Sequence, residues 1–215
     1  MDKALQKTHY CDFDHPRIKK ISETLSEKAD DKKSIARIIF QYVREEIIYG
    51  FDIYRKTASA TLDTGYGVCW NKSLLLTSLL RSNNIPAHIG TVSMRRQFVA
   101  PTAGSLHKCI NEPFQHFLVF AQIGKQWVVL DAVLDSKTYE HFYRRLDVKW
   151  GIDWDGQSDC VLYPEHRLGQ PELHENLDEL IHSRAGNKEW PGIFAKATNM
   201  LLNKRLWKKT GRSFV

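Results

Sequence analysis

Three side chains in this sequence are of the types that together perform nucleophilic chemistry: a cysteine, a histidine and an aspartate. Cys69 follows Gly65 and Gly67 and precedes a leucine-rich run, so it is expected at the start of a buried helix. A positive helix end favours anions, and the thiolate rather than the thiol is the nucleophile. Because an isolated cysteine at such a place is more often a core residue, the assignment depends on finding a base.

A candidate base lies between Phe114 and Asp135, where two apolar runs flank a break at 123–125 and predict a β-hairpin. A turn centred on 123–124, or a four-residue loop, places His116 opposite Asp131. A turn centred on 124–125 makes the two diagonal neighbours on one face, and a three-residue loop separates them. An aspartate beside a histidine fixes its tautomer and stabilises its protonated form, as an activated cysteine requires.

Two other histidines are weaker candidates for the base. His88 lies in a strand predicted over Ala87–Met94 and has no acidic partner in a hairpin. His107 lies close to Cys109 in the segment Arg95–Glu112, which is predicted to be a long loop near the site. We therefore expect His116 to serve Cys69.

The combination resembles the transglutaminase-like branch of the papain-like cysteine enzymes. The three reactive residues are 47 and 15 positions apart, and the order and spacing fit that family. The resemblance covers residues 29–135, about half of the chain, including a run at 29–49 similar to the helix before the nucleophile. The matching motifs are Thr64-Gly65-Tyr66-Gly67-Val68-Cys69, Gln115-His116-Phe117 and Trp127-Val128-Val129-Leu130-Asp131.

The resemblance implies an enzyme in which Cys69 attacks a carbonyl and forms a thioester, His116 moves the proton and Asp131 orients His116. If water accepts the acyl group from the thioester, the enzyme is a peptidase or amidase. Small cytosolic proteins with transglutaminase-like domains resemble hydrolases of this kind more often than cross-linking enzymes. An amine would give an acyltransferase that forms amides. A non-catalytic binding module is the alternative from another class, and the intact triad argues against it. The expected partner is a peptide, protein or small amide substrate, with no cofactor and no metal.

The resemblance also implies an oxyanion site formed partly by the Cys69 backbone amide. The side-chain donor is expected to be Tyr49, Tyr54 or Trp70, and the sequence does not choose among them. The chain departs from many relatives at Asn71, where they have an acidic residue, and at 132–134, where they have a proline-containing turn. Neither departure removes a member of the triad.

The elements that position these residues follow from apolar periodicity. We expect a single α+β domain, residues 1–215, with a transglutaminase-like, papain-like core at about 29–135 and a C-terminal elaboration at 136–215. In it a buried nucleophile helix packs on an antiparallel sheet that carries the histidine and the aspartate. Segment 51–64 is expected to be irregular or extended. Helices are expected over 16–29, 32–48, 69–82, 139–145, 172–182 and 193–207.

Composition excludes several classes of protein. The chain of 215 residues is 42% hydrophobic and 26% charged, as in soluble globular proteins, and its net charge of +6 does not indicate nucleic-acid binding. The four cysteines are widely spaced without a CxxC pair, which argues against a disulfide framework or structural zinc. The acids at 147–159 do not follow the spacing of a calcium loop, so we expect solvated turns there.

No apolar run reaches the roughly eighteen residues of a membrane span, and the first residues lack the apolar segment of a secretory signal. We therefore expect a cytoplasmic location. The basic, amphipathic segment near the C-terminus is expected to dock on the domain with a solvated basic face rather than on a membrane. The substrate and the oligomeric state stay open.

Overall fold

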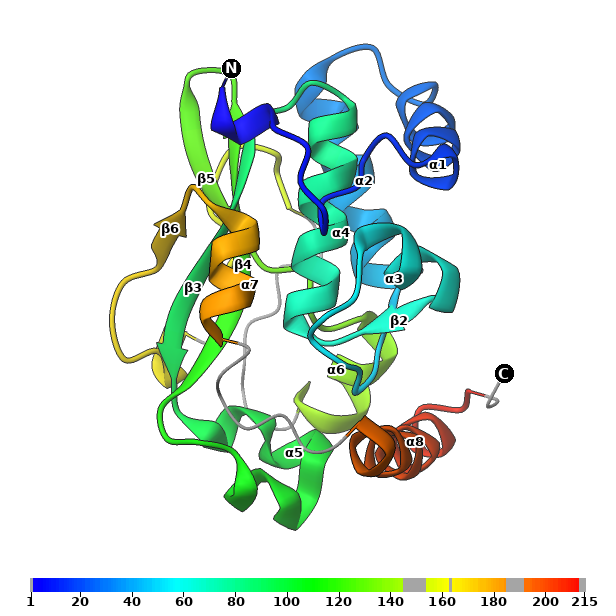
Figure 1. Ribbon diagram of the computed structural model, residues 1–215, viewed down its shortest axis with the longest axis vertical. Coiled ribbons are helices and arrows are strands. Elements are labelled where there is room, and N and C mark those ends of the chain that lie inside the picture. The colour runs from blue at the N-terminus through cyan, green and yellow to red at the C-terminus, as the bar shows by residue number, and fades with distance from the viewer. Residues whose placement is uncertain (1, 145–153, 163, 185–191, 213–215) are drawn as a thin grey trace.

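A mixed α/β architecture is seen in the computed structural model, which describes residues 2–144, 154–162, 164–184 and 192–212 (Figure 1). A four-stranded antiparallel sheet has the strand order β5-β4-β3-β6. Its strands are β3 (Ala87–Met94), β4 (Phe114–Ile123), β5 (Gln126–Leu130) and β6 (Glu172–His174). A separate parallel pair is formed by β1 (Ile48–Tyr49) and β2 (Tyr66–Gly67).

Helices lie against the sheet and around one another. The α-helices are α1 (Pro16–Ser26), α2 (Lys32–Glu45), α3 (Ala58–Thr64), α4 (Cys69–Ser82), α5 (Ala100–Ala103), α6 (Ser136–Phe142), α7 (Leu177–Arg184) and α8 (Gly192–Lys209). Short 3-10 helices are η1 (Lys3–Leu5), η2 (Arg96–Val99), η3 (Gly104–Cys109) and η5 (Pro164–His166).

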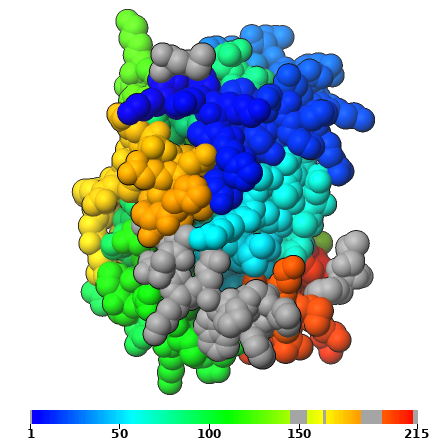
Figure 2. All heavy atoms as spheres, viewed as in Figure 1, coloured from blue at the N-terminus to red at the C-terminus, as the bar shows by residue number. Residues whose placement is uncertain are grey.

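Helix α4 is the centre of the molecule. It contacts β3 and β4 of the sheet and also α1, α2 and α3, so it is enclosed by both layers (Figure 1). Its five leucines are fully buried, and each stabilises the fold by roughly 1.5–3 kcal/mol relative to exposure. On the face shown in Figure 2, the N-terminal segment lies across the molecule between α7 and α3 and helps to cover this interior. That segment is tied down where the Ala58 amide donates to the Tyr10 carbonyl.

The buried apolar residues form two clusters, and Cys69 packs against both. One cluster lies between α4, the N-terminal helices and the sheet, and includes Trp70 and Phe117. The other includes Tyr49, Phe98 and Trp207, from segments far apart in the sequence. The start of α4 is therefore the place where the two clusters meet.

Several predictions made from the sequence are confirmed. The structure has the predicted α+β class with an antiparallel sheet, and helix α4 begins at Cys69. The hairpin of β4 and β5 and the C-terminal helix α8 are also present. Among the described residues, no helix has both the length and the apolar character needed to cross a membrane.

Four local predictions were wrong. Segment 51–64 contains α3, which is capped by the Thr57 side chain. The helix expected over 32–48 ends at Glu45, because residues 48–49 form β1 and pair with residues 66–67. Segment 172–182 begins as β6, which adds to the edge of β3 before α7 starts. The loop expected over 95–112 consists largely of η2, α5 and η3. At β1 and β6, pairing with distant residues overrides the local pattern. The predicted turns at Asp147, Trp150 and Asp153 lie outside the described residues.

Candidate active site

Two glycines bring the chain to Cys69. Gly65 ends α3 with a left-handed φ of 68°, a conformation that other residues adopt at a cost. At Gly67 the reason is space, because a Cβ there would lie 2.5 Å from Cβ of Asn71. The Asn71 side chain accepts from the Val68 amide at 3.1 Å and donates to the Ile53 carbonyl at 3.0 Å. Asn71 therefore fastens the turn to both the helix start and the preceding segment.

Cys69 is a reduced, partly exposed cysteine at the first position of α4. The first amides of a helix have no partner within it, and the helix end carries a partial positive charge. Both features favour an anion at this position. Cys69 is partly exposed, whereas Cys11 and Cys160 are buried.

His116 and Asp131 form a buried pair on the β4–β5 hairpin. Nε2 of His116 lies 2.7 Å from Oδ2 of Asp131, and the two residues are 1% and 2% exposed. Ile123 pairs with Gln126, so the turn is centred on residues 124 and 125. Of the registers considered from the sequence, the diagonal arrangement is the one found. Asp131 is held in place because its amide donates to the Cys160 carbonyl at 2.8 Å and its Oδ1 accepts from the Val133 amide.

The surroundings of His116 favour its protonated form. Burial alone would lower the pKa of His116, but the charge and hydrogen bond of Asp131 outweigh it. The charge of Cys69 acts in the same direction, and together these effects raise the pKa of His116 to about 10.

Cys69 lies near the same ring, since its charge is among the causes that raise the pKa of His116. Nε2 of His116 is engaged by Asp131, so Nδ1 is the nitrogen left to exchange a proton with the sulfur. Among the described residues Nδ1 of His116 has no hydrogen-bond partner. The edge of the ring is enclosed by Phe98 and Phe114, whose ring centroids lie 5.5 and 6.4 Å away. Sequence reasoning did not single out these two phenylalanines, although both lie in or beside the segment expected near the site.

The three oxyanion candidates lie in different environments. The Tyr49 side chain is buried, and burial followed by the negative charge of the Cys69 thiolate raises its pKa. The Trp70 side chain is also buried, and its Nε1 has no partner among the described residues. Tyr54 is 40% exposed and stacks on Trp70 with ring centroids 6.4 Å apart. Of the three candidates, Tyr49 and Trp70 are buried and Tyr54 is partly exposed.

The weaker histidine candidates have other neighbours. Nδ1 of His107 lies 2.7 Å from the Gly104 carbonyl within η3, and Cys109 is exposed. His88 packs against the half-exposed Trp127 at a centroid distance of 5.4 Å. Within the described ranges, no group of three or more histidine, cysteine, aspartate or glutamate side chains is placed to hold a metal ion.

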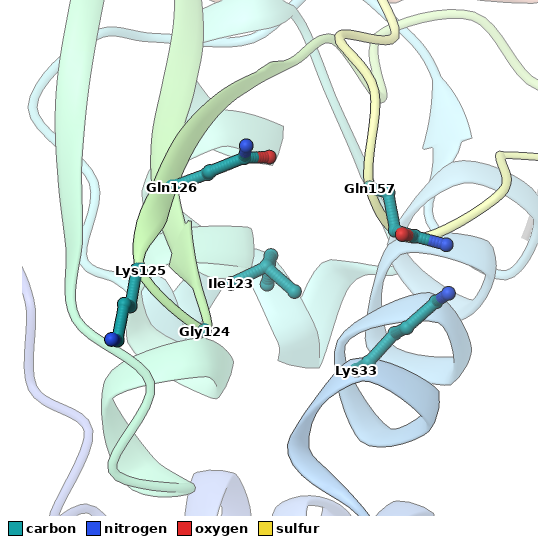
Figure 3. A pocket seen from close by; sticks show the side chains of 6 residues that line it. All are labelled: Lys33, Ile123, Gly124, Lys125, Gln126 and Gln157. Atoms are coloured by element: carbon teal, nitrogen blue, oxygen red, sulfur yellow. The ribbon is translucent and has the colours of Figure 1, made fainter.

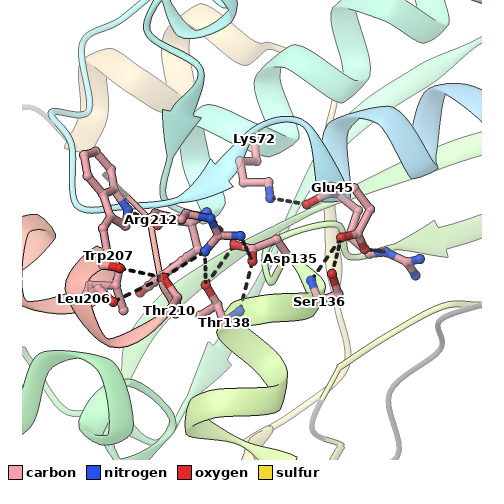
Figure 4. Close-up of polar contacts among 11 residues, drawn as sticks. Glu45, Lys72, Asp135, Ser136, Thr138, Leu206, Trp207, Thr210 and Arg212 are labelled. Carbon is pink, nitrogen blue, oxygen red and sulfur yellow. Dashed lines mark hydrogen bonds and ion pairs between the residues drawn. The ribbon is translucent and has the colours of Figure 1, made fainter. Parts of the chain in front are cut away.

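A buried charge cluster lies on the side of α4 one turn beyond Cys69 (Figure 4). Lys72 donates from Nζ to the Arg44 carbonyl at 3.0 Å. Burial lowers the pKa of Lys72 to about 7, although the charges of Asp135, Glu45 and Asp131 oppose the shift. Burial would raise the pKa of Asp135, but Lys72, the Tyr49 amide and Arg212 lower it. No sequence motif pointed to this cluster.

An open hollow of about 450 Å³ lies elsewhere, between the tip of the β4–β5 hairpin and the start of α2 (Figure 3). It contains none of the three reactive residues. It is lined by Lys33, Ile123, Gly124, Lys125, Gln126 and Gln157.

Comparison with known proteins assigns the chain to a family. Residues 19–132, more than half of the chain, match the model of the transglutaminase-like superfamily. The chain belongs to the transglutaminase-like superfamily, and all three reactive residues lie within the matched segment. None of the curated proteins compared matches the sequence.

Solved structures with a similar arrangement include a candidate cysteine protease from Cytophaga hutchinsonii, at 24% identity and a TM-score of 0.48 over 60% of this chain and 40% of that one. The periplasmic domain of TgpA from Pseudomonas aeruginosa matches 67% of this chain and 50% of its own, at 16% identity and a TM-score of 0.45. Red sea bream transglutaminase matches 99% of this chain and 43% of its own, at 15% identity and a TM-score of 0.40. This chain thus spans half or less of each of these proteins.

Proposed function

We propose that the protein is a cysteine hydrolase that cleaves an amide or ester bond through a thioester on Cys69. The observation that carries the proposal is the buried pair of His116 and Asp131, 2.7 Å apart, beside a partly exposed cysteine at a helix start. An imidazolium held by a carboxylate next to a thiolate is the arrangement that cysteine nucleophiles use. Membership of the superfamily supports the same class of chemistry.

In the proposed reaction, Sγ of Cys69 attacks the carbonyl carbon of the substrate and the carbonyl oxygen becomes an oxyanion. The intermediate collapses when His116 gives its proton to the leaving amine or alcohol, which departs and leaves a thioester. A water molecule then loses a proton to His116 and attacks the thioester, which releases the acid and regenerates the thiolate and the imidazolium. Asp131 keeps the ring oriented and its charge balanced throughout.

The oxyanion needs hydrogen-bond donors. The Cys69 amide is one donor, because the first amides of a helix are free. For the second donor we favour Trp70 over Tyr54, since Nε1 of Trp70 is buried without a partner among the described residues, whereas Tyr54 is 40% exposed. Trp70→Phe keeps the ring and removes the donor, so it should lower kcat by roughly ten- to a thousandfold. An unchanged kcat would show that Trp70 is not the second hydrogen-bond donor to the oxyanion.

The test uses 4-nitrophenyl hexanoate as an acyl donor whose leaving group is coloured. The proposal expects a burst of nitrophenolate equal to the enzyme concentration and a hexanoyl group on Cys69 in peptide mass spectrometry. Cys69→Ala should abolish both, whereas Cys109→Ala, at an exposed cysteine, is the matched control and should change neither. A full burst from the Cys69 variant, or acylation confined to Cys109, would refute the proposal.

The same adduct separates a hydrolase from an acyltransferase. The protein acylated on Cys69 is divided into two portions, one in buffer and one with methylamine. The products of each portion are identified by mass spectrometry. Release of hexanoic acid at the same rate in both portions supports the hydrolase. Faster decay with formation of the methylamide would identify an acyltransferase on the same triad.

A further inference from the structure

The strand β1 beside the nucleophile has an unusual outer edge. On its inner edge it pairs with β2, because the Ile48 amide donates to the Gly65 carbonyl at 3.0 Å and the Gly50 amide donates to the Gly67 carbonyl at 3.2 Å. The outer edge would ordinarily face water or another strand. Here the backbone groups of residues 49 and 51 on that edge are bonded by side chains instead.

Three of these four bonds come from helix α8. The Asn203 side chain accepts from the Phe51 amide at 2.7 Å and donates to the Phe51 carbonyl at 2.9 Å, as a neighbouring strand would. Nε1 of Trp207 donates to the Tyr49 carbonyl at 3.1 Å. Asn203 and Trp207 are 2% and 5% exposed, so these bonds are shielded from water. Gly50 leaves room for them, since a Cβ there would be 3.0 Å from the Trp207 ring.

The fourth bond is fixed by an ion pair from the residues after α8 (Figure 4). Oδ2 of Asp135 accepts from the Tyr49 amide at 2.8 Å, and Oδ1 accepts from the Thr138 amide at 2.9 Å. The guanidinium of Arg212 donates to the same fully buried carboxylate and lies 3.1 Å from Thr210. The end of the chain is thus bonded to the carboxylate that holds β1.

The strand that is held in this way forms one wall of the candidate site. Tyr49 projects into the cluster against which Cys69 packs, and after burial the charge of Cys69 also acts to raise the pKa of its hydroxyl. The partner strand β2 ends at Gly67, two residues before Cys69. A shift of β1 would therefore move both the Tyr49 side chain and the approach to the nucleophile.

We propose that α8 and Arg212 form a clamp on β1, defined by Asn203, Trp207 and Arg212, which positions Tyr49 and the Gly67–Cys69 turn for reaction. The clamp lies outside residues 19–132, which match the superfamily. The three side chains are positioning residues, because they act through β1 and not on the substrate. The proposal rests on the proposed cysteine chemistry.

The test compares Trp207→Phe, Asn203→Ala and Arg212→Met with a matched control, Lys204→Ala, at an exposed position of the same helix. Burst amplitude with 4-nitrophenyl hexanoate counts active molecules, and the burst rate constant reports how well each one reacts. Loss of one such hydrogen bond should slow the acylation of Cys69 by roughly three- to tenfold. Burst amplitude and KM should change less than twofold, and Lys204→Ala should behave as the unaltered protein.

A role in folding alone predicts the opposite pattern, with a lower burst amplitude and an unchanged rate constant, and that result would overturn the clamp. Arg212→Lys keeps the cation near Asp135, so it should recover most of the rate lost in Arg212→Met. If the substituted proteins do not fold, amide hydrogen exchange of the unaltered protein tests whether β1 is held by these bonds. Protected amides at Tyr49 and Phe51 support the clamp, and amides that exchange as fast as those of exposed loops overturn it. Absence of acylation at Cys69 in the unaltered protein would instead refute the proposed function.

Discussion

Replacement of the buried lysine Lys72 by methionine tests the electrostatics beside the site. The pKa of Lys72 falls from its ordinary value of 10.5 to about 7, so between these two pH values the folded protein carries one proton fewer than the unfolded chain at this residue. Stability contributed by Lys72 therefore increases with pH across the window, by about 1.4 kcal/mol per pH unit and by roughly 5 kcal/mol in all. The cost of burying the charge is fully present below pH 7 and is gone above 10.5.

Lys72→Met removes this titration and keeps a side chain of similar length. The free energy of unfolding of the variant, minus that of the unaltered protein, should fall by about 1.4 kcal/mol per pH unit between pH 7 and 10. The difference is the quantity to use, because all other titrations are common to both proteins. The loss of the hydrogen bond from Lys72 to the Arg44 carbonyl adds to this free-energy difference an amount that does not vary with pH, so it does not affect the slope.

The assay is urea unfolding followed by tryptophan fluorescence at pH 7, 8, 9 and 10, with linear extrapolation to water. Lys208→Met, at an exposed position on α8, is the matched control, and its difference from the unaltered protein should not vary with pH. A flat difference for Lys72→Met would mean that the buried ammonium titrates as in the unfolded chain. The reasoning about the charge cluster would then be wrong.

Three further results are expected. His116→Gln should show a change of the opposite sign, with its stability difference from the unaltered protein rising as pH approaches about 10, because the raised pKa of His116 stabilises the fold below that pH and the effect is lost as pH rises through it. Unfolding at the same pH values checks this, and a falling difference contradicts it. Iodoacetamide at pH 6 should label Cys69 before Cys109, although Cys109 is the more exposed cysteine, and peptide mass spectrometry measures the order. Asp131→Asn should reverse that order. Faster labelling of Cys109 in the unaltered protein would contradict an activated Cys69. Gly67→Ala should destabilise the protein by about 1–3 kcal/mol, because its Cβ would meet that of Asn71 at 2.5 Å, and a denaturation midpoint equal to that of the unaltered protein would show that the turn yields freely.

Sequence alone predicted those parts of the fold and site whose residues are close together in the chain. Helix α4 follows from an uninterrupted leucine band between glycines and the Asn84–Pro86 stop, and its burial leaves little choice of position. The pairing of His116 with Asp131 follows from a short hairpin, and only the register had to be settled by the turn at Gly124. Local spacing limits such contacts strongly.

Contacts between distant segments were beyond the reach of pattern analysis. Strand β6 is a three-residue addition to the edge of β3, and nothing in Glu172–His174 distinguishes it from the start of a helix. Asn203 and Phe51 are 152 residues apart, and an asparagine within a basic helix gives no sign of bonding to a strand. Lys72 would be expected at the surface, because the acids that surround it come from other elements.

The separation of the three reactive residues along the chain has a consequence during folding. His116 and Asp131 are 15 positions apart in one hairpin, whereas Cys69 is 47 positions from His116 and lies on a different element. Short-range contacts form sooner than long-range ones. We therefore expect the imidazole–carboxylate pair to exist in partly folded chains before the sulfur reaches it. A nascent chain would then carry a thiol of ordinary reactivity, and the proposed chemistry on Cys69 would begin only when folding brings the three residues together.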